Sequence, residues 1–88
     1  MTLIIDPKDA STYPAGLRIT CSYDASWTYI HYKGITRAVY PREDGTFSIG
    51  KPDSYPTYVD VECETGFPDA DIAVARAIEI LTGAFVEI

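Results

Sequence analysis

The stretch GFPDADIAVARAIEILTGAF, residues 66–85, decides the fold. Apolar side chains recur in it at spacings of three and four, which predicts an amphipathic helix from Phe67 to Phe85. The expected apolar stripe consists of Val74, Ala77, Ile78, Leu81, Ala84 and Phe85. Pro68 fits a first turn, Asp69 is a suitable N-cap, and Gly83 is placed to end the helix in a left-handed conformation. A helix of about four turns cannot bury this stripe alone, so the preceding residues should form a sheet.

Strand-like segments fill most of the chain before the helix. Leu17–Tyr23 and Thr57–Glu64 alternate between apolar and polar side chains with the period of two that half-buried strands show. Trp27–Tyr32 is rich in aromatic and β-branched residues, which favour strands. The remaining expected strands are Thr2–Ile5, as a short edge strand, Ile35–Tyr40 and Thr46–Ile49. Residues 6–16 and 50–56 contain prolines and are expected to be loops.

Two features of this strand pattern can be interpreted in more than one way. Lys33-Gly34 is either a two-residue hairpin turn or a bulge in one long strand, and we favour the bulge because Lys-Gly is weaker turn chemistry than Asn-Gly. The sequence also does not decide which side of 27–32 is buried. Either Trp27, Tyr29 and His31 or the alternate set, Thr28, Ile30 and Tyr32, can face the core. Pro41–Gly45, by contrast, has the composition of a hairpin loop.

These elements predict an α+β fold. We expect an antiparallel meander of four or five strands with one C-terminal helix packed across one face. The alternation in the first and last full strands indicates that the second face is polar and lies in water. A chain of 88 residues is long enough for one core, so residues 1–88 are expected to form a single domain.

The formal net charge of −6 is concentrated in one segment. Residues 52–75 contain six acidic side chains and no basic one. Such a local negative field argues against direct binding to nucleic acid and favours a basic protein partner or a cation. The chain has no apolar run of membrane-spanning length and no secretion signal at its start, so we expect no membrane association and a cytoplasmic location.

The candidate binding surface is a row of acids on the last predicted strand. Period-two geometry would place Asp60, Glu62 and Glu64 on one face, roughly 6.5–7 Å apart, which approaches the spacing of phosphates along a nucleic acid strand. The predicted partner-binding residues are Asp53, Tyr55, Tyr58, Asp60, Glu62, Glu64, Asp69 and Asp71. The alternative interpretation is a solvated strand face that keeps the protein soluble and blocks edge pairing.

No catalytic or metal motif emerges from the nucleophilic and ligating residues. Cys21 and Cys63 occupy predicted inward positions and are expected to be buried thiols, with a disulfide as the alternative if their strands are neighbours. His31 is the only histidine, so a zinc site lacks ligands, and a Cys–His site would need His31 to meet Cys21. We therefore predict a protein that is not an enzyme and binds neither cofactor nor metal.

In length, acidity and a sheet with one helix, the chain resembles the small inhibitors that bacteriophages and mobile elements direct against host machinery, including anti-CRISPR and anti-restriction proteins. No motif corresponds to a particular family, so the resemblance assigns no residue a role. It implies a protein-binding module, acting in the host cytoplasm, that occupies the basic groove of a nucleic-acid-binding protein. The alternative functions are a self-associating structural or assembly protein, such as a phage particle component, and a small enzyme using His31 and Cys21. A monomer or a homodimer is expected.

Overall fold

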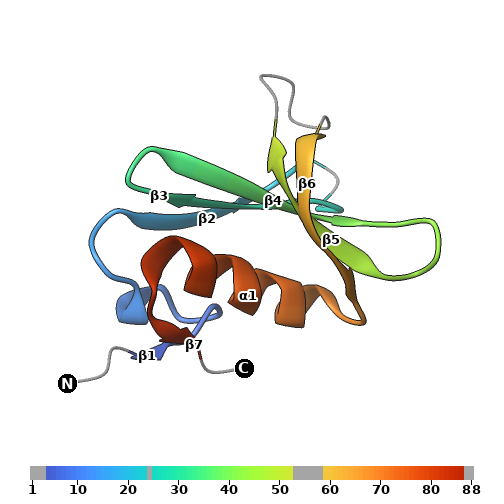
Figure 1. Ribbon diagram of the computed structural model, residues 1–88. Helices are drawn as coiled ribbons and strands as arrows, with labels where there is room; N and C mark the ends of the chain where they lie inside the picture. Colours follow the sequence, from blue (N-terminus) through green and yellow to red (C-terminus); the bar gives the residue numbers. More distant parts are fainter. Residues whose placement is uncertain (1–3, 24, 53–58, 87–88) are drawn as a thin grey trace.

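A five-stranded antiparallel sheet with one helix across it forms the body of the protein (Figure 1). The computed structural model describes residues 4–23, 25–52 and 59–86, and for residues 59–61 and 85 the backbone alone. The elements are β1 (Ile4–Ile5), the 3-10 helix η1 (Ala10–Thr12), β2 (Leu17–Cys21), β3 (Thr28–Tyr32), β4 (Ile35–Pro41), β5 (Phe47–Pro52), β6 (Val59–Phe67), α1 (Ala70–Thr82) and β7 (Phe85–Val86). Strands β2 to β6 are neighbours in chain order, which confirms the predicted meander and the α+β class.

The helix is shorter than the sequence pattern predicts. It begins after Asp69, which has an extended backbone. The side-chain carboxylate of Asp69 caps the helix by accepting a hydrogen bond from the N–H of Asp71 at 2.7 Å. It ends at Gly83, which adopts a left-handed conformation with φ 69°. The prediction of helix at Phe67 and Phe85 is therefore wrong, because the two caps leave Phe67 in β6 and Phe85 in β7.

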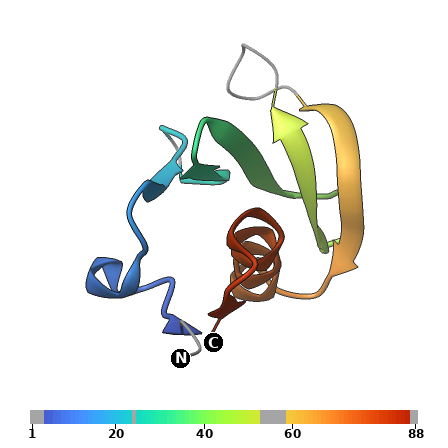
Figure 2. The same cartoon turned by 60° about the vertical axis from the view of Figure 1, so that its left-hand side comes forward.

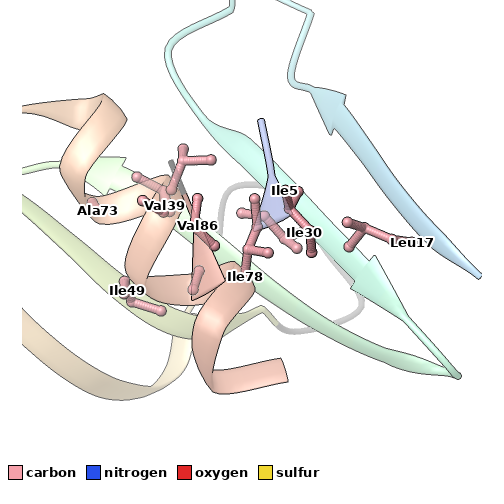
Figure 3. Packing of buried hydrophobic residues seen from close by; sticks show 11 residues of the cluster. Ile5, Leu17, Ile30, Val39, Ile49, Ala73, Ile78 and Val86 are labelled. Atoms are coloured by element: carbon pink, nitrogen blue, oxygen red, sulfur yellow. The ribbon is translucent and has the colours of Figure 1, made fainter. Parts of the chain in front are cut away.

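The core lies between α1 and the face of the sheet that it covers, called the helix face below. Ile30, Val39 and Ile49 project from three neighbouring strands toward Ile78 and the small residues around it, and all are at most 2% exposed (Figure 3). Burying each such aliphatic side chain contributes on the order of 1.5–3 kcal/mol. No helix among the described residues is long and apolar enough to cross a membrane.

The two ends of the described chain pair with each other. Strands β1 and β7 form a separate parallel pair, in which Ile4 lies opposite Phe85 and Ile5 opposite Val86. Ile5 and Val86 are buried and join the core cluster, so this pair closes the core away from the sheet (Figure 2). The N-terminal strand was predicted as an edge strand, and its pairing with the C-terminal residues was not anticipated.

A tight hairpin joins β3 to β4, so the favoured bulged-strand interpretation is wrong. Tyr32 pairs with Ile35, which leaves Lys33 and Gly34 as a two-residue turn. Both have positive φ, 51° and 82°, as a type I′ turn requires, and this turn matches the twist of the strands. The loop after β4 is the predicted hairpin, with Gly45 at φ 85°.

Strand β6 bends strongly along its length. Its pairing with β5 contains three register shifts, at each of which the two strands advance by unequal numbers of residues. Such irregularities bend a strand and increase its twist. The sheet accordingly curves around α1, with β2 at one end of the curve and β6 at the other (Figure 2).

Candidate binding face

The face of the sheet opposite α1 is called the outer face. Residues directly opposite in neighbouring strands share a face, and residues next to a core residue point the other way. The described outer-face residues are Arg18, Thr20, Trp27, Tyr29, His31, Thr36, Ala38, Tyr40, Ser48, Gly50 and Glu62. The open question about residues 27–32 is thereby answered, since Ile30 faces the core while Trp27, Tyr29 and His31 lie on the outer face.

An aromatic cluster occupies the middle of the outer face. The rings of Trp27 and Tyr40 are stacked, with centroids 4.9 Å apart, and Tyr29 lies 6.4 Å from Trp27. Together with Ala38 they form a second hydrophobic cluster, separate from the core under α1. Tyr29 and Tyr40 are buried, whereas Trp27 remains partly exposed. The expectation of a polar second face is therefore wrong at its centre, where large rings shield one another from water.

A carboxylate borders this cluster. The hydroxyl of Tyr40 donates to Oε2 of Glu62 at 2.6 Å, and the guanidinium of Arg42 donates to the same oxygen. Burial, and then the neighbouring Glu62 carboxylate, raise the pKa of Tyr40 to about 12. Trp27, Tyr40, Glu62 and Arg42 thus form one connected group of apolar, anionic and cationic side chains.

His31 connects three strands on the same face. One ring nitrogen lies 2.9 Å from the hydroxyl of Thr20 on β2, and the other lies 3.0 Å from the hydroxyl of Thr36 on β4. Burial, and then the charge of Arg18, lower the pKa of His31. Cys21 pairs with Thr28 on the helix face, so His31 and Cys21 lie on opposite faces and do not form a Cys–His pair.

One buried hydroxyl on the outer face lacks a hydrogen-bond partner among the described residues. Ser48 lies opposite Tyr40 and is fully buried, and its Oγ has no hydrogen-bond partner among the described residues. A buried hydroxyl without a partner costs about 1–3 kcal/mol relative to one that is solvated.

The predicted acidic row is broken by a bulge in β6. Gly50 pairs with Glu62 and its neighbour Ile49 pairs with Glu64, so Cys63 is the extra residue of β6 at this bulge. Because Ile49 faces the core and Gly50 does not, Glu62 lies on the outer face and Glu64 on the helix face. The prediction that the acids share one face is therefore wrong for these two residues.

The described acids of the predicted surface already have partners within the protein. Glu64 accepts two hydrogen bonds of 3.1 Å from Arg76 on α1, and its carboxylate raises the pKa of that guanidinium. Asp69 caps α1, and Asp71 lies 3.5 Å from the ammonium group of Lys8. The predicted residues Asp53, Tyr55 and Tyr58, and the side chain of Asp60, lie outside the described residues.

Both cysteines are exposed, and neither forms a disulfide. The prediction of buried thiols is therefore wrong, and the two cysteines belong to the edge strands β2 and β6, which are not neighbours. Cys21 lies on the helix face near the end of β2 but remains exposed, and Cys63 occupies the bulge. Among the described residues, no three His, Cys, Asp or Glu side chains are grouped as a metal site would require.

No protein-family model, curated protein or solved structure matches the chain. The predicted binding residues do not include Trp27, Tyr29 or Tyr40, although the period-two pattern of Trp27, Tyr29 and His31 indicates an aromatic strand face. The contact of Arg42 and Tyr40 with Glu62 joins residues 20 and more positions apart, and no local pattern indicates it.

Proposed function

We propose that the protein is a non-enzymatic binding module that docks a basic protein surface on the outer face of its sheet. The observation that carries this proposal is the stacked pair of Trp27 and Tyr40 beside the carboxylate of Glu62. Trp and Tyr are the residues that most often dominate binding energy in protein interfaces, since their large rigid rings lose little entropy on binding.

The chemistry around Trp27 suits a cationic side chain. An arginine of the partner can stack on the exposed part of the indole ring and direct its guanidinium to Glu62. Glu62 is already paired with Arg42, but both side chains are partly exposed, at 35% and 42%. Ion pairs with this exposure contribute roughly 0–1 kcal/mol, so an incoming cation can replace Arg42 at small cost. The net charge of −6 adds a field that attracts basic partners.

The proposal is tested by capture from a cell lysate with charge-reversed variants. Glu62→Lys and Glu64→Lys are a matched pair, because they make the same change two positions apart but on opposite faces. The partner should be retained by Glu64→Lys and lost by both Glu62→Lys and Trp27→Lys, after circular dichroism has confirmed that each variant folds. Ile80→Lys, on the exposed side of α1, is a further control that should keep binding.

Equal loss of the partner in Glu62→Lys and Glu64→Lys would favour the acidic strand as the binding surface and contradict docking on the outer face. Unchanged capture by Trp27→Lys, or no protein captured at all, would also count against the proposal. The inhibitor hypothesis adds that the partner binds nucleic acid. Under that hypothesis, single-stranded or duplex DNA added to the loaded resin should release the partner, and a partner retained in its presence would exclude competition.

A further inference from the structure

Strand β2 is an edge of the sheet that no other described strand covers. It stands at the end of the strand order, so only one of its sides pairs with a described strand. It pairs with β3 residue for residue from Leu17 to Cys21, without a register shift. A regular edge strand presents a row of backbone donors and acceptors to any other extended chain.

The opposite edge of the sheet is irregular. Strand β6 carries three register shifts against β5, together with the charged side chains of Glu62 and Glu64. Bulges and charges are the features by which proteins prevent their edge strands from pairing. Strand β2 has neither bulge nor acid, and its single charge is Arg18. The two edges therefore differ in their capacity to accept another strand.

The hairpin between β3 and β4 determines which backbone groups of β2 point outward. A two-residue turn is closed by a hydrogen-bonded pair, here Tyr32 and Ile35, and hydrogen-bonded and non-bonded pairs then alternate along the strands. The backbone of His31 is thus directed toward Arg18 of β2, and Thr20 is likewise bonded to β3. It follows that the odd-numbered residues of β2 direct their N–H and C=O groups away from the sheet.

Two hydrogen bonds agree with this alternation. The N–H of Leu17 donates at 3.1 Å to the carbonyl of Pro14, which is outside the sheet, whereas the N–H of Ser22 donates at 2.9 Å to the carbonyl of Trp27, on the β3 side. Leu17 therefore has its outward N–H occupied. Ile19 and Cys21 remain as the residues of β2 whose outward groups bond no other described backbone.

We infer that β2 pairs with β2 of a second copy of this chain, antiparallel about a two-fold axis at Thr20. In this register Ile19 lies opposite Cys21 of the second copy, and the two residues exchange two backbone hydrogen bonds. By the two-fold symmetry, Cys21 forms the same two hydrogen bonds with Ile19 of the second copy. The two Thr20 side chains face each other on the outer face, a favourable cross-strand pair. Arg18 lies opposite Ser22, so no like charges meet.

Side-chain burial supports the same pairing. On the helix face Ile19 is partly buried and Cys21 is exposed. Tyr23, just beyond the strand, is fully exposed. A second β2 would place Cys21 beside Ile19 and extend the sheet over this apolar strip. In a closed two-fold dimer the β2 edges of the two copies pair with each other, so neither β2 remains open to a third copy. The outer faces of the two copies would then lie on the same side of one continuous sheet.

The register is tested by a disulfide that only this dimer can form. Thr20→Cys is made together with Cys21→Ser and Cys63→Ser, so that the single thiol faces its own copy across the two-fold axis. Under mild oxidation most of this variant should become a disulfide-linked dimer. As a control, Thr65→Cys is made with Cys21→Ser and Cys63→Ser but without Thr20→Cys. Its single thiol lies on the exposed part of β6, so this variant should remain monomeric on a non-reducing gel.

Light scattering of the unmodified protein supplies the second readout. The wild-type protein should have twice the mass of the chain, and Ile19→Pro, which removes one outward N–H without removing a bond to β3, should have the mass of one chain. A wild-type monomer at high concentration would overturn the inference. So would a dimer that persists in Ile19→Pro while Thr20→Cys fails to cross-link, because that result places the interface elsewhere. Neither readout depends on the partner proposed for the outer face.

Discussion

Glu62 and Glu64 are two residues apart on one strand, yet they lie on opposite faces of the sheet. Each is bound to a different cation, Glu62 to Arg42 and Glu64 to Arg76. The bulge at Cys63 separates them, since one residue of β5 is matched by two of β6 at this point. These two residues therefore do not form a row of acids that could imitate the phosphates of one nucleic acid strand.

This arrangement predicts which charges are coupled. In double-mutant cycles measured by urea unfolding, Glu64→Gln with Arg76→Gln and Glu62→Gln with Arg42→Gln should each show a favourable coupling free energy that decreases with added salt. Glu64→Gln with Arg42→Gln should show none. Coupling of Glu64 to Arg42 as strong as that of Glu62 would mean that both acids share a face after all.

The titration of Tyr40 tests the contact with Glu62. Its pKa is raised to about 12, first by burial and then by the carboxylate. Because the folded state holds the phenol proton more tightly than the unfolded state, this contribution to stability is complete below pH 10 and is lost as pH rises toward 12. Tyrosinate absorbance of the wild type minus that of Tyr40→Phe should show the late titration, and Glu62→Gln should shift it to lower pH. A Tyr40 phenol that titrates at its ordinary value of 10 would contradict the contact.

The cysteines should react in the folded protein. Both Cys21 and Cys63 are exposed in the single chain, so a thiol reagent should modify both without denaturant in the monomeric Ile19→Pro variant, in which the proposed β2 pairing does not cover Cys21. Cys21→Ser and Cys63→Ser identify each thiol, and each single variant should retain one reactive group. Thiols that react only in urea would restore the sequence-based expectation of buried cysteines.

Ser48 should be replaceable without loss of stability. Ser48→Ala removes a buried hydroxyl that has no partner among the described residues, so the free energy of unfolding should stay the same or rise by about 1 kcal/mol. Thr36→Val is the comparison, because its hydroxyl bonds His31 and its removal should lower stability by about 1 kcal/mol. Destabilisation of more than 1 kcal/mol by Ser48→Ala, measured by urea unfolding, would show that the hydroxyl has a partner.

The fold was predictable from local patterns, whereas the site was not. Period-three-to-four spacing and the caps Asp69 and Gly83 indicate the helix, and period-two alternation indicates the strands, because each depends on residues close in sequence. The bulge at Cys63 has no such signature, since it is a mismatch between two strands rather than a property of one. Because period-two alternation assumes a strand without bulges, it predicts the wrong face of the sheet for Glu64.

The hairpin at Lys33 shows the same limit. Lysine at positive φ is unfavourable by itself, and the pairing of β3 with β4 on both sides of the turn maintains it. The pairing of β1 with β7 joins segments about 80 residues apart, for which propensity carries no information.

Trp27 is the only tryptophan of the chain and stands at the centre of the proposed docking face, so its fluorescence tests the central proposal most directly. The partner recovered by capture is titrated into the protein, with the tryptophan signal of the partner alone subtracted, while complex formation is followed by light scattering. Docking on the outer face predicts that the Trp27 emission shifts to shorter wavelength and that iodide quenching decreases in proportion to the complex formed. A complex that forms while the emission and quenching of Trp27 stay unchanged would contradict it.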